Sequence, residues 1–318
     1  MKILLFGANG QVGHELRRSL ASLGEVVATT RSGVLEKSMF DYGMLDNGMS
    51  DDGIRCETAD FDTPDALPAL IARIAPDVVV NAAAYTAVDR AESDRDAAFR
   101  ANAEAPQRIA EACAARDALL VHYSTDYVFD GSGTRPYRED DPTSPLGVYG
   151  ESKLAGEIAI QASGARYMIF RTAWVYASHG KNFMRTMLRL AAERDELRVV
   201  ADQVGTPTPA ALIADVTAAV LVRPFARSGT WHLTAAGETT WHRFAEAITA
   251  AAHARGQLGR IPRVVPIATA DYPTPAKRPA YSRLDIASIE AEFSIVMPDW
   301  RTALEMILDG RDFRFDNV

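Results

Sequence analysis

The residues best suited to proton chemistry are Tyr149 and Lys153, which stand four positions apart in the segment Leu-Gly-Val-Tyr-Gly-Glu-Ser-Lys-Leu-Ala-Gly. On a helix, residues with this spacing lie on one face, with Cβ atoms about 5–6 Å apart. A nearby ammonium favours the phenolate, so we expect Lys153 to lower the pKa of Tyr149 from its usual value of about 10. A phenol tuned in this way can exchange a proton near neutral pH, as the reduction of a carbonyl requires.

A hydroxyl group is expected to work beside this pair. Thr125 follows an apolar run at 119–124 that predicts a strand. A hydroxyl at the end of that strand can hydrogen-bond the carbonyl oxygen that Tyr149 protonates. Taken alone, a hydroxyl residue at a strand end more often caps the backbone, so this assignment depends on the motifs around it.

A glycine-rich turn joins the first predicted strand, residues 2–6, to the first predicted helix. The turn reads Gly-Ala-Asn-Gly-Gln-Val-Gly and places glycines at Gly7, Gly10 and Gly13. Glycine permits a tight turn and lets the backbone approach a pyrophosphate, which binds at the helix N-terminus. An ordinary βα turn is the alternative, but the position after the first strand favours dinucleotide binding.

The end of the second predicted strand, 25–30, indicates which dinucleotide is bound. An acidic residue there would bind the ribose 2′-hydroxyl, whereas this chain has Thr30 and Arg31. An arginine without a neighbouring carboxylate suits a 2′-phosphate, so we expect NADPH, with NADH as a second option. If Arg31 is only a solvated residue, this position offers no reason to expect NADPH instead of NADH.

Two further strand ends carry residues that fit a cofactor. Asp60 could accept a hydrogen bond from the adenine amino group, with Phe61 beside it, although the pair could equally start a helix. Ala82, Ala83 and Ala84 end the strand predicted at 78–81. Small side chains at this place leave room for a flat ligand, although alanine runs are also common in packed interiors.

These motifs fall at the ends of strands that alternate with helices. Strands are predicted at 2–6, 25–30, 78–81, 119–124 and 167–172, and a helix is predicted over 97–115. A second helix should open with Ser144 as N-cap and Pro145 as its first residue, and end near residue 162. The alternation implies right-handed βαβ units. The expected fold class is therefore α/β, with a Rossmann-type doubly wound parallel sheet.

The chain is expected to form two parts. Residues 1–172 would make the dinucleotide-binding domain, to which parts of 205–230 return. Residues 173–318 would mainly make a smaller C-terminal α/β cap that binds the substrate. Helices are predicted in this half near 182–194, 210–222, 241–255 and 300–308. The glycine-punctuated stretch 33–53 fits a surface insertion.

Composition narrows the classes of partner. The formal net charge is −8 and no basic run occurs, which disfavours nucleic acid and anionic membranes. Cys56 and Cys113 have no metal-binding or redox spacing. No stretch has the length and apolar character of a signal peptide or a membrane span. We therefore expect a cytoplasmic protein that acts on a small molecule.

Longer segments resemble a known family. The glycine turn, the strand end at 81–84, the hydroxyls at 124 and 125 and the Tyr149–Lys153 pair resemble those of the extended short-chain dehydrogenase/reductases. The segments 80–89, 123–131, 170–176 and 202–208 look like those of the dTDP-4-dehydrorhamnose reductases within that family. The similarity covers essentially the whole chain except about residues 33–53.

The resemblance implies a reaction, in which NAD(P)H reduces the C4 ketone of dTDP-4-dehydro-β-L-rhamnose to give dTDP-L-rhamnose. Tyr149 would donate the proton, Lys153 would hold the nicotinamide ribose, and Thr125 would bind the sugar carbonyl. The other implied contacts are Gly10, Gln11 and Val12 at the cofactor diphosphate, Ala84, Tyr85 and Thr86 along the cofactor, and Thr125, Asp126 and Trp174 at the sugar nucleotide. Core packing is the alternative for Trp174. Asn182 is a candidate substrate contact from its place in the second half, with a plain surface position as the alternative.

Other activities and a metal are also considered. A dehydratase is disfavoured because Asp126 is followed by Tyr127 where an adjacent Asp-Glu pair is needed. An epimerase of the same broad family and a non-catalytic NAD(P)-binding regulatory protein stay open. The resemblance implies magnesium-bridged dimers for some members, with a glutamate where this chain has Ala211. We therefore expect no metal bridge, and either a monomer or a homodimer.

Overall fold

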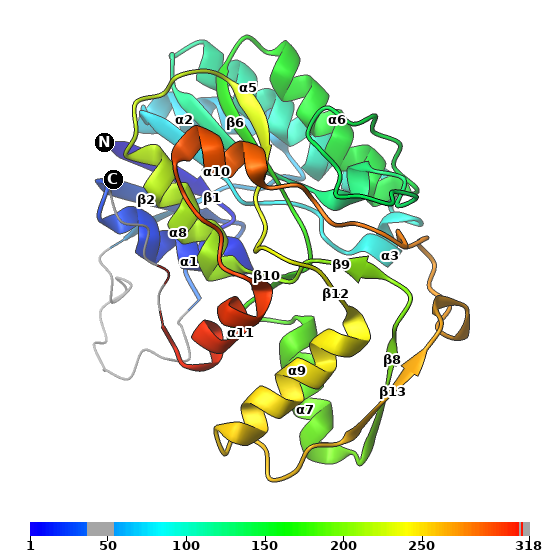
Figure 1. Ribbon diagram of the computed structural model, residues 1–318. Helices are drawn as coiled ribbons and strands as arrows, with labels where there is room; N and C mark the ends of the chain where they lie inside the picture. The colour runs from blue at the N-terminus through cyan, green and yellow to red at the C-terminus, as the bar shows by residue number, and fades with distance from the viewer. Residues whose placement is uncertain (37–53, 312, 314–318) are drawn as a thin grey trace.

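The computed structural model describes residues 1–36, 54–311 and 313 of the 318-residue chain. Its centre is a seven-stranded sheet with the order β11-β6-β5-β4-β1-β2-β3, and all neighbouring strands are parallel (Figure 1). The strands are β1 (Lys2–Phe6), β2 (Glu25–Thr30), β3 (Arg55–Thr58), β4 (Val78–Asn81), β5 (Leu119–Thr125), β6 (Arg166–Thr172) and β11 (Gly229–His232). The predicted fold class, a Rossmann-type doubly wound parallel sheet, is confirmed.

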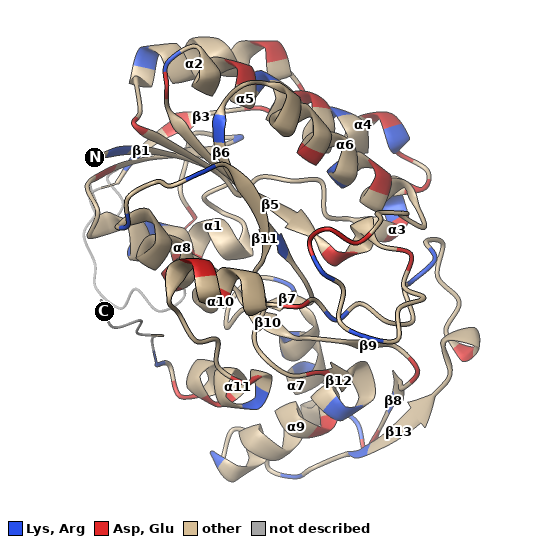
Figure 2. Cartoon of the chain, turned by 45° about the horizontal axis from the view of Figure 1, so that its top comes forward, with Lys and Arg blue, Asp and Glu red and all other residues tan. Residues whose placement is uncertain are grey.

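Helices cover both faces of this sheet because its central strands are apolar on both sides. In β1, Ile3 and Leu5 belong to one core and Leu4 and Phe6 to the other, and all four are fully buried. One face is covered by α1 (Gln11–Ala21) and α8 (Ala210–Leu221), and the other by α2 (Leu67–Ile74), α5 (Ala105–Ala114) and α6 (Val148–Ala162) (Figure 2).

A smaller α/β cap is built from segments that follow β6. Helices α7 (Phe183–Glu193) and α9 (Trp241–Ala254) pack on the parallel pair β8 (Glu196–Val200) and β13 (Arg263–Ile267), and α11 (Trp300–Leu308) packs on α9. Two short pairs complete it, β7 (Val175–Tyr176) with β10 (Thr208–Pro209) and β9 (Val204–Gly205) with β12 (Thr239–Thr240). Between these segments, α8 and β11 return to the large sheet.

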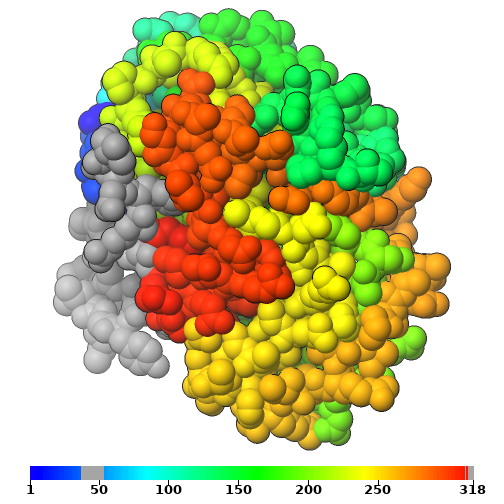
Figure 3. Space-filling view, viewed as in Figure 1, coloured from blue at the N-terminus to red at the C-terminus, as the bar shows by residue number. Residues whose placement is uncertain are grey.

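The C-terminal segment connects the two halves. Helix α10 (Ala287–Phe293) packs on β11, and α11 follows it into the cap. Figure 3 shows this segment as a continuous orange and red band along the surface. The helices predicted near 182–194, 210–222, 241–255 and 300–308 are confirmed to within one residue at each end.

The helix predicted over 97–115 is interrupted. The chain there forms α4 (Arg95–Phe99), a π-helical turn (Arg100–Glu104) and α5. Pro106 lacks the amide hydrogen that a regular helix would donate to the carbonyl of Asn102. That carbonyl lies close to α6, since a Cβ on Gly156 would be only 2.1 Å from its oxygen. The irregular turn therefore lies where α6 approaches most closely.

The predicted start of α6 at Ser144 and Pro145 is wrong, because the helix begins at Val148 with Gly147 as its N-cap. The backbone N–H of Ser144 donates to the carbonyl of Val128 at 2.9 Å, which holds this residue in a loop. The N–H of Val148 donates to Glu92 Oε1 at 2.9 Å. A carboxylate just after the short helix α3 (Val88–Ala91) therefore caps α6.

Only residues 33–36 of the insertion predicted at 33–53 lie in the part of the chain that the structure describes. Asn9 in the glycine turn donates through Nδ2 to the carbonyl of Val34 at 3.0 Å and accepts from the N–H of Glu36 at 2.9 Å. The insertion therefore starts directly beside the glycine turn. Among the described helices, none has the length and apolar character needed to cross a membrane.

Candidate active site

The glycine turn is shaped by two close backbone approaches. Gly7 has a φ of +79°, and a Cβ there would lie 2.6 Å from the backbone nitrogen of Ala83. A Cβ on Gly13 would lie 2.0 Å from the carbonyl oxygen of Gly7. Gly10 is the N-cap of α1 and has no side chain to cap the helix. The amides of the first turn, where Gln11 and Val12 stand, can therefore bind a phosphate group.

A cavity of about 210 Å³ opens beside this turn. This volume is below the roughly 300–1,000 Å³ of most small-molecule sites, so it suits one end of a dinucleotide. Its lining joins predicted cofactor residues to four that were not selected from the sequence, Thr29, Ala59, Asp62 and Ala101. The predicted members are Gly7, Thr30, Arg31, Phe61, Ala83, Ala84 and Tyr85. Ala59 and Asp62 flank the predicted Asp60 and Phe61, whereas Ala101 lies on the π-helical turn and carries no sequence signal.

Arg31 lies at the mouth of this cavity with its side chain 72% exposed. Its Nε is 3.3 Å from Asp60 Oδ1, and its Nη2 is 3.2 Å from Asp62 Oδ2. The premise that Arg31 has no neighbouring carboxylate is therefore wrong. Both aspartates follow β3, which pairs with β2, so residues about thirty positions apart in sequence meet at one sheet edge. An exposed arginine between two carboxylates is held loosely and can exchange one of them for a phosphate.

Five predicted cofactor contacts, residues 82–86, follow β4, and Ala82 and Ala83 are half-buried. Ala84 and Thr86 are exposed. Tyr85 is fixed at both ends, because its backbone N–H donates to Asn102 Oδ1 at 2.8 Å and its hydroxyl donates to Asp94 Oδ2 at 3.1 Å. The segment is therefore positioned by the π-helical turn and α4.

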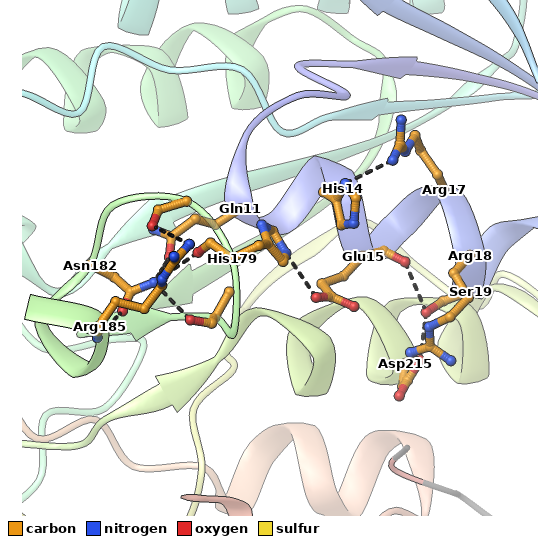
Figure 4. Close-up of polar contacts among 12 residues, drawn as sticks. Gln11, His14, Glu15, Arg17, Arg18, Ser19, His179, Asn182, Arg185 and Asp215 are labelled. Atoms are coloured by element: carbon orange, nitrogen blue, oxygen red, sulfur yellow. Dashed lines mark hydrogen bonds and ion pairs between the residues drawn. The ribbon is translucent and has the colours of Figure 1, made fainter. Parts of the chain in front are cut away.

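Asn182 lies between the glycine turn and the cap (Figure 4). Its Nδ2 donates to Gln11 Oε1 at 2.9 Å, and its Oδ1 accepts from the backbone N–H of Arg185 at 3.0 Å as the N-cap of α7. His179 in the same loop lies 2.9 Å from Glu15 Oε1 on α1. The amide of Asn182 is thus engaged by the protein on both sides, and its contact with a substrate stays a prediction.

Lys153 is 2% exposed and is held by groups on β5. Its Nζ donates to the carbonyl of Tyr123 at 2.6 Å and lies 3.3 Å from His122 Nε2. Burial lowers the pKa of this ammonium to about 8, against the opposing charge of Glu157 one turn along α6. Arg171 engages that carboxylate through Nε and Nη2, with the closest distance 2.7 Å. Lys153 is therefore close to losing its charge in the neutral range.

The pKa of Tyr149 shifts in the direction opposite to that expected from the sequence. Burial raises the pKa of its phenol above the usual value, a hydrogen bond with Thr125 partly opposes this, and Asp126 and Tyr127 add to it. The prediction of a lowered pKa is therefore wrong for the chain alone, because burial outweighs the effect of the lysine, whose nitrogen is bound to β5. The ring of Tyr149 meets the edge of the Tyr127 ring, with centroids 5.5 Å apart. The phenol therefore stays protonated, as a proton donor must be before the reaction.

Thr125 caps the backbone, which is the alternative role left open by the sequence, and its hydrogen bond to a sugar carbonyl stays a prediction. Its Oγ1 accepts from the N–H of Tyr127 at 3.2 Å, which caps the 3₁₀ turn Asp126–Val128, and its hydroxyl lies close enough to the Tyr149 phenol to affect the pKa of that group. The same hydroxyl donates to Asp126 Oδ1 at 3.0 Å. Burial raises the pKa of the Asp126 carboxyl to about 6, partly opposed by hydrogen bonds. The predicted catalytic residues Thr125 and Tyr149 are thus brought together.

Trp174 stands just after β6 with a φ of +48°. Its indole stacks on that of Trp241 from α9, with ring centroids 3.6 Å apart and planes 7° apart. A Cβ on Gly205 would lie 2.5 Å from the Trp174 ring. The half-buried indole is therefore a rigid plate between the sheet and the cap.

Arg278 is a neighbour of the site that the sequence did not reveal. It extends from the proline-rich loop at 272–279, where its Nη1 donates to the Tyr127 hydroxyl at 3.1 Å and its Nη2 lies 2.7 Å from Asp89 Oδ2. Its distance in sequence from these partners explains why no local motif points to it. Among the described residues, no group of three or more His, Cys, Asp or Glu side chains could hold a metal ion. Ala211, at the expected place of a bridging glutamate, is buried in α8.

A glycine turn at the first strand of a doubly wound sheet, with a buried Tyr–Lys pair near the strand ends, defines the class of Rossmann-type dinucleotide-dependent oxidoreductases. Comparison with known proteins narrows this class. Residues 1–312 match the model of the family described as RmlD substrate binding domain, and the chain belongs to this family.

Proteins similar to this chain in sequence and in structure share one name. The chain is 48% identical over 315 residues to a dTDP-4-dehydrorhamnose reductase of Burkholderia thailandensis, covering 96% of this chain and 97% of that protein. The crystal structure of a dTDP-4-dehydrorhamnose reductase from Clostridium acetobutylicum has a TM-score of 0.83 and 35% identity, over 97% of this chain and 99% of that chain. The corresponding Bacillus anthracis structure, in complex with NADP, has a TM-score of 0.84 and 31% identity over the same shares.

Proposed function

We propose that this protein is the NADPH-dependent reductase of the C4 ketone of dTDP-4-dehydro-β-L-rhamnose. The product is dTDP-L-rhamnose, and the reaction is the last step of dTDP-rhamnose biosynthesis for cell-surface polysaccharide. One observation carries the proposal: Tyr149 lies beside Thr125 at the end of β5, and the same strand holds Lys153, in a chain 48% identical along nearly its whole length to a protein with this name.

The residues present fit a dinucleotide. Gly7 and Ala83, which lie in close contact, form a part of the cavity wall that has no bulky side chain, and the uncapped N-terminus of α1 supplies amides for the diphosphate. A bound NADPH would supply the hydride. We assign Arg31 to the 2′-phosphate of NADPH. An exposed ion pair contributes little binding energy, so NADH stays a second option. The family relationship to a structure in complex with NADP supports the first choice.

The protein supplies the proton. Tyr149 holds it firmly in the free protein because burial raises the pKa of its phenol. As hydride is added to the sugar C4, negative charge develops on its oxygen, and the phenolic proton of Tyr149 moves to that oxygen. Thr125 keeps the phenol and the carbonyl oxygen together through its hydroxyl. The ammonium of Lys153 then stabilises the phenolate that is left behind.

The cap and the end of β5 together supply the substrate contacts. We assign Thr125, Asp126, Trp174 and Asn182 to the sugar nucleotide. The stacked indole of Trp174 offers a flat surface, and Arg278 adds a cation near the site in a chain of net charge −8. In this assignment, residues 1–172 with α8 and β11 bind the cofactor, and the rest of 173–318 binds most of the substrate, with Thr125 and Asp126 reaching it from the end of β5. The reactants are soluble metabolites, which fits a cytoplasmic enzyme acting as a monomer or a homodimer.

A turnover assay tests the proposal. Purified protein is mixed with NADPH and dTDP-4-dehydro-β-L-rhamnose, and NADPH absorbance and product are measured together. We expect one NADPH to be oxidised for each dTDP-L-rhamnose formed, and no oxidation with dTDP-glucose, which has no ketone. An epimerase would convert the sugar without net oxidation, and that result would refute the reductase.

A further inference from the structure

A buried chain of polar groups runs from the end of β4 to Lys153. The backbone nitrogen of Ala83 is 3.2 Å from Asn81 Oδ1, and Asn81 Nδ2 is 3.1 Å from His122 Nδ1. His122 Nε2 is in turn 3.3 Å from Lys153 Nζ. Asn81, His122 and Lys153 are each at most 2% exposed. Solvent therefore cannot relieve a mismatch between donors and acceptors along this chain.

The donors and acceptors between Ala83 and Lys153 can be arranged in only one way. The N–H of Ala83 can only donate, so the Asn81 atom that it contacts must be the oxygen. The amide nitrogen of Asn81 has only hydrogens to offer, so His122 Nδ1 must accept. Burial lowers the pKa of His122 well below its usual value and keeps the ring neutral. A neutral imidazole that accepts at Nδ1 carries its proton on Nε2.

The Nε2–H group of His122 therefore points at Lys153 Nζ. A neutral amine has a lone pair that can accept this hydrogen, whereas an ammonium has three donors and no acceptor. With the ammonium, two buried donors would face each other. The other partner of Nζ, the carbonyl of Tyr123, can accept from either form. The Asn81–His122 pair thus distinguishes between the two protonation states of the lysine.

We propose that Asn81 and His122 are positioning residues for Lys153, which present an N–H group to its nitrogen, favour the neutral amine and so set the alkaline limit of the reaction. The proposal rests on the proposed function, in which the ammonium stabilises the Tyr149 phenolate. Burial already lowers the pKa of Lys153 to about 8. The charge is present below this pH and lost above it, so the turnover rate should fall as the pH rises through this value.

Other charges around Lys153 do not reproduce this effect. Glu157 on α6 favours the ammonium, and its carboxylate is engaged by Arg171 from β6. Asp126 on the 3₁₀ turn acts on Tyr149. Several charged residues on the other elements packed against α6 are paired elsewhere: Glu92 with Val148, Arg95 with Glu151, Arg100 with Asp62, and Arg108 with Asp65 and Glu111. Besides burial, the N–H group of His122 therefore opposes the charge of Lys153 by direct contact.

The proposal can be tested without an activity assay, by determining which ring nitrogen of His122 carries the proton. The full-length protein is labelled with ¹⁵N-histidine, and multiple-bond ¹H–¹⁵N spectra are recorded, with His122→Phe identifying the signal. We expect the His122 proton on Nε2. His232 is an internal reference of the opposite kind, because its Nδ1 lies 3.1 Å from the carbonyl of Asp285 and must carry the proton. A His122 proton on Nδ1 would overturn the proposal, whatever substrate the protein acts on.

Asn81→Asp tests the consequence for the reaction. A carboxylate accepts from both the Ala83 N–H and His122 Nδ1, which moves the imidazole proton to Nδ1 and leaves Nε2 to accept from the ammonium. The alkaline limb of kcat should then move up by about one pH unit or more. Asn102→Asp is the matched control, because this buried asparagine contacts Tyr85 and Ser152 instead of His122. Its His122 tautomer should match the wild type, and an unmoved alkaline limb in Asn81→Asp would contradict the proposal.

Discussion

The cofactor end and the catalytic end of the candidate site differ in the groups that form them. At the cofactor end, backbone and small side chains such as Gly7, Ala83 and Ala84 line part of a cavity of about 210 Å³. At the catalytic end, burial shifts the pKa of both Tyr149 and Lys153, and neighbouring side chains modify each shift. The first end depends on available space, which local sequence largely determines. The second depends on electrostatics, which comes from contacts between distant parts of the chain.

The largest effect is expected from removing the proton donor at the catalytic end. Tyr149→Phe deletes the phenolic hydroxyl and leaves the ring that packs on Tyr127. We predict that kcat falls by at least about 10²–10⁴-fold, the usual contribution of general acid catalysis, with little change in NADPH affinity. Steady-state kinetics and cofactor titration measure the two quantities. Unchanged turnover would show that another group donates the proton.

At the cofactor end, we expect the affinity for NADPH to fall when a larger side chain fills space beside the glycine turn. Gly7→Ala combines a φ of +79° with a Cβ only 2.6 Å from the Ala83 backbone, so we predict at least a tenfold loss of NADPH affinity and a lower Tm. Gly164→Ala is the matched control, because its φ is +78° and nothing lies within 4 Å of its Cβ. It should lose only about 1–2 kcal/mol from backbone strain and keep its cofactor affinity. Equal affinity losses would mean that the close approach is unimportant.

Asp126 offers a pH-dependent test of the buried catalytic end. Its pKa is raised from 3.8 to about 6, so the folded state favours the protonated carboxyl. That stabilisation is present below about pH 4 and is lost as the pH rises through 6, which amounts to about 3 kcal/mol. Asp126→Asn should therefore raise the free energy of unfolding at pH 7.5 more than at pH 4, measured by urea denaturation.

Asp130 provides the control for this measurement. Hydrogen bonds from Tyr137 and Ser132 lower the pKa of its carboxyl to about 2, so Asp130→Asn should weaken the protein at pH 7.5. If both variants change stability in the same direction, burial is not the dominant influence on Asp126.

The smallest effect is expected at the mouth of the cofactor cavity. Arg31→Ala removes an exposed cation from between Asp60 and Asp62, and we predict about a tenfold weaker affinity for NADPH with a smaller change for NADH. Arg73→Ala, which breaks an exposed ion pair with Glu57, should leave both affinities unchanged. Equal losses for the two cofactors would remove the 2′-phosphate role of Arg31.

Features that depend on local sequence were predictable. The glycine turn follows from a run of glycines after an apolar strand, and the strands and most helices follow from hydrophobic periodicity. Tyr149 and Lys153 lie on one helix, as their spacing indicates. The family resemblance added the reaction, which no spacing could provide.

Features that depend on tertiary contacts were not predictable. The start of α6 is set by Glu92, which reaches Val148 from 56 positions away. The carboxylates beside Arg31 follow the neighbouring strand, and the pKa of Tyr149 rises because the packed fold buries its phenol. Each of these interactions requires the packed fold, so a single sequence carries no local signal for it.

The central claim is that NADPH transfers hydride to the sugar C4. The most direct test uses NADPH carrying deuterium at both positions of nicotinamide C4 together with dTDP-4-dehydro-β-L-rhamnose, and the sugar product is examined by NMR and mass spectrometry. We predict dTDP-L-rhamnose with one deuterium bound to C4 and an equal amount of oxidised cofactor. A product without deuterium at C4 would contradict the assignment.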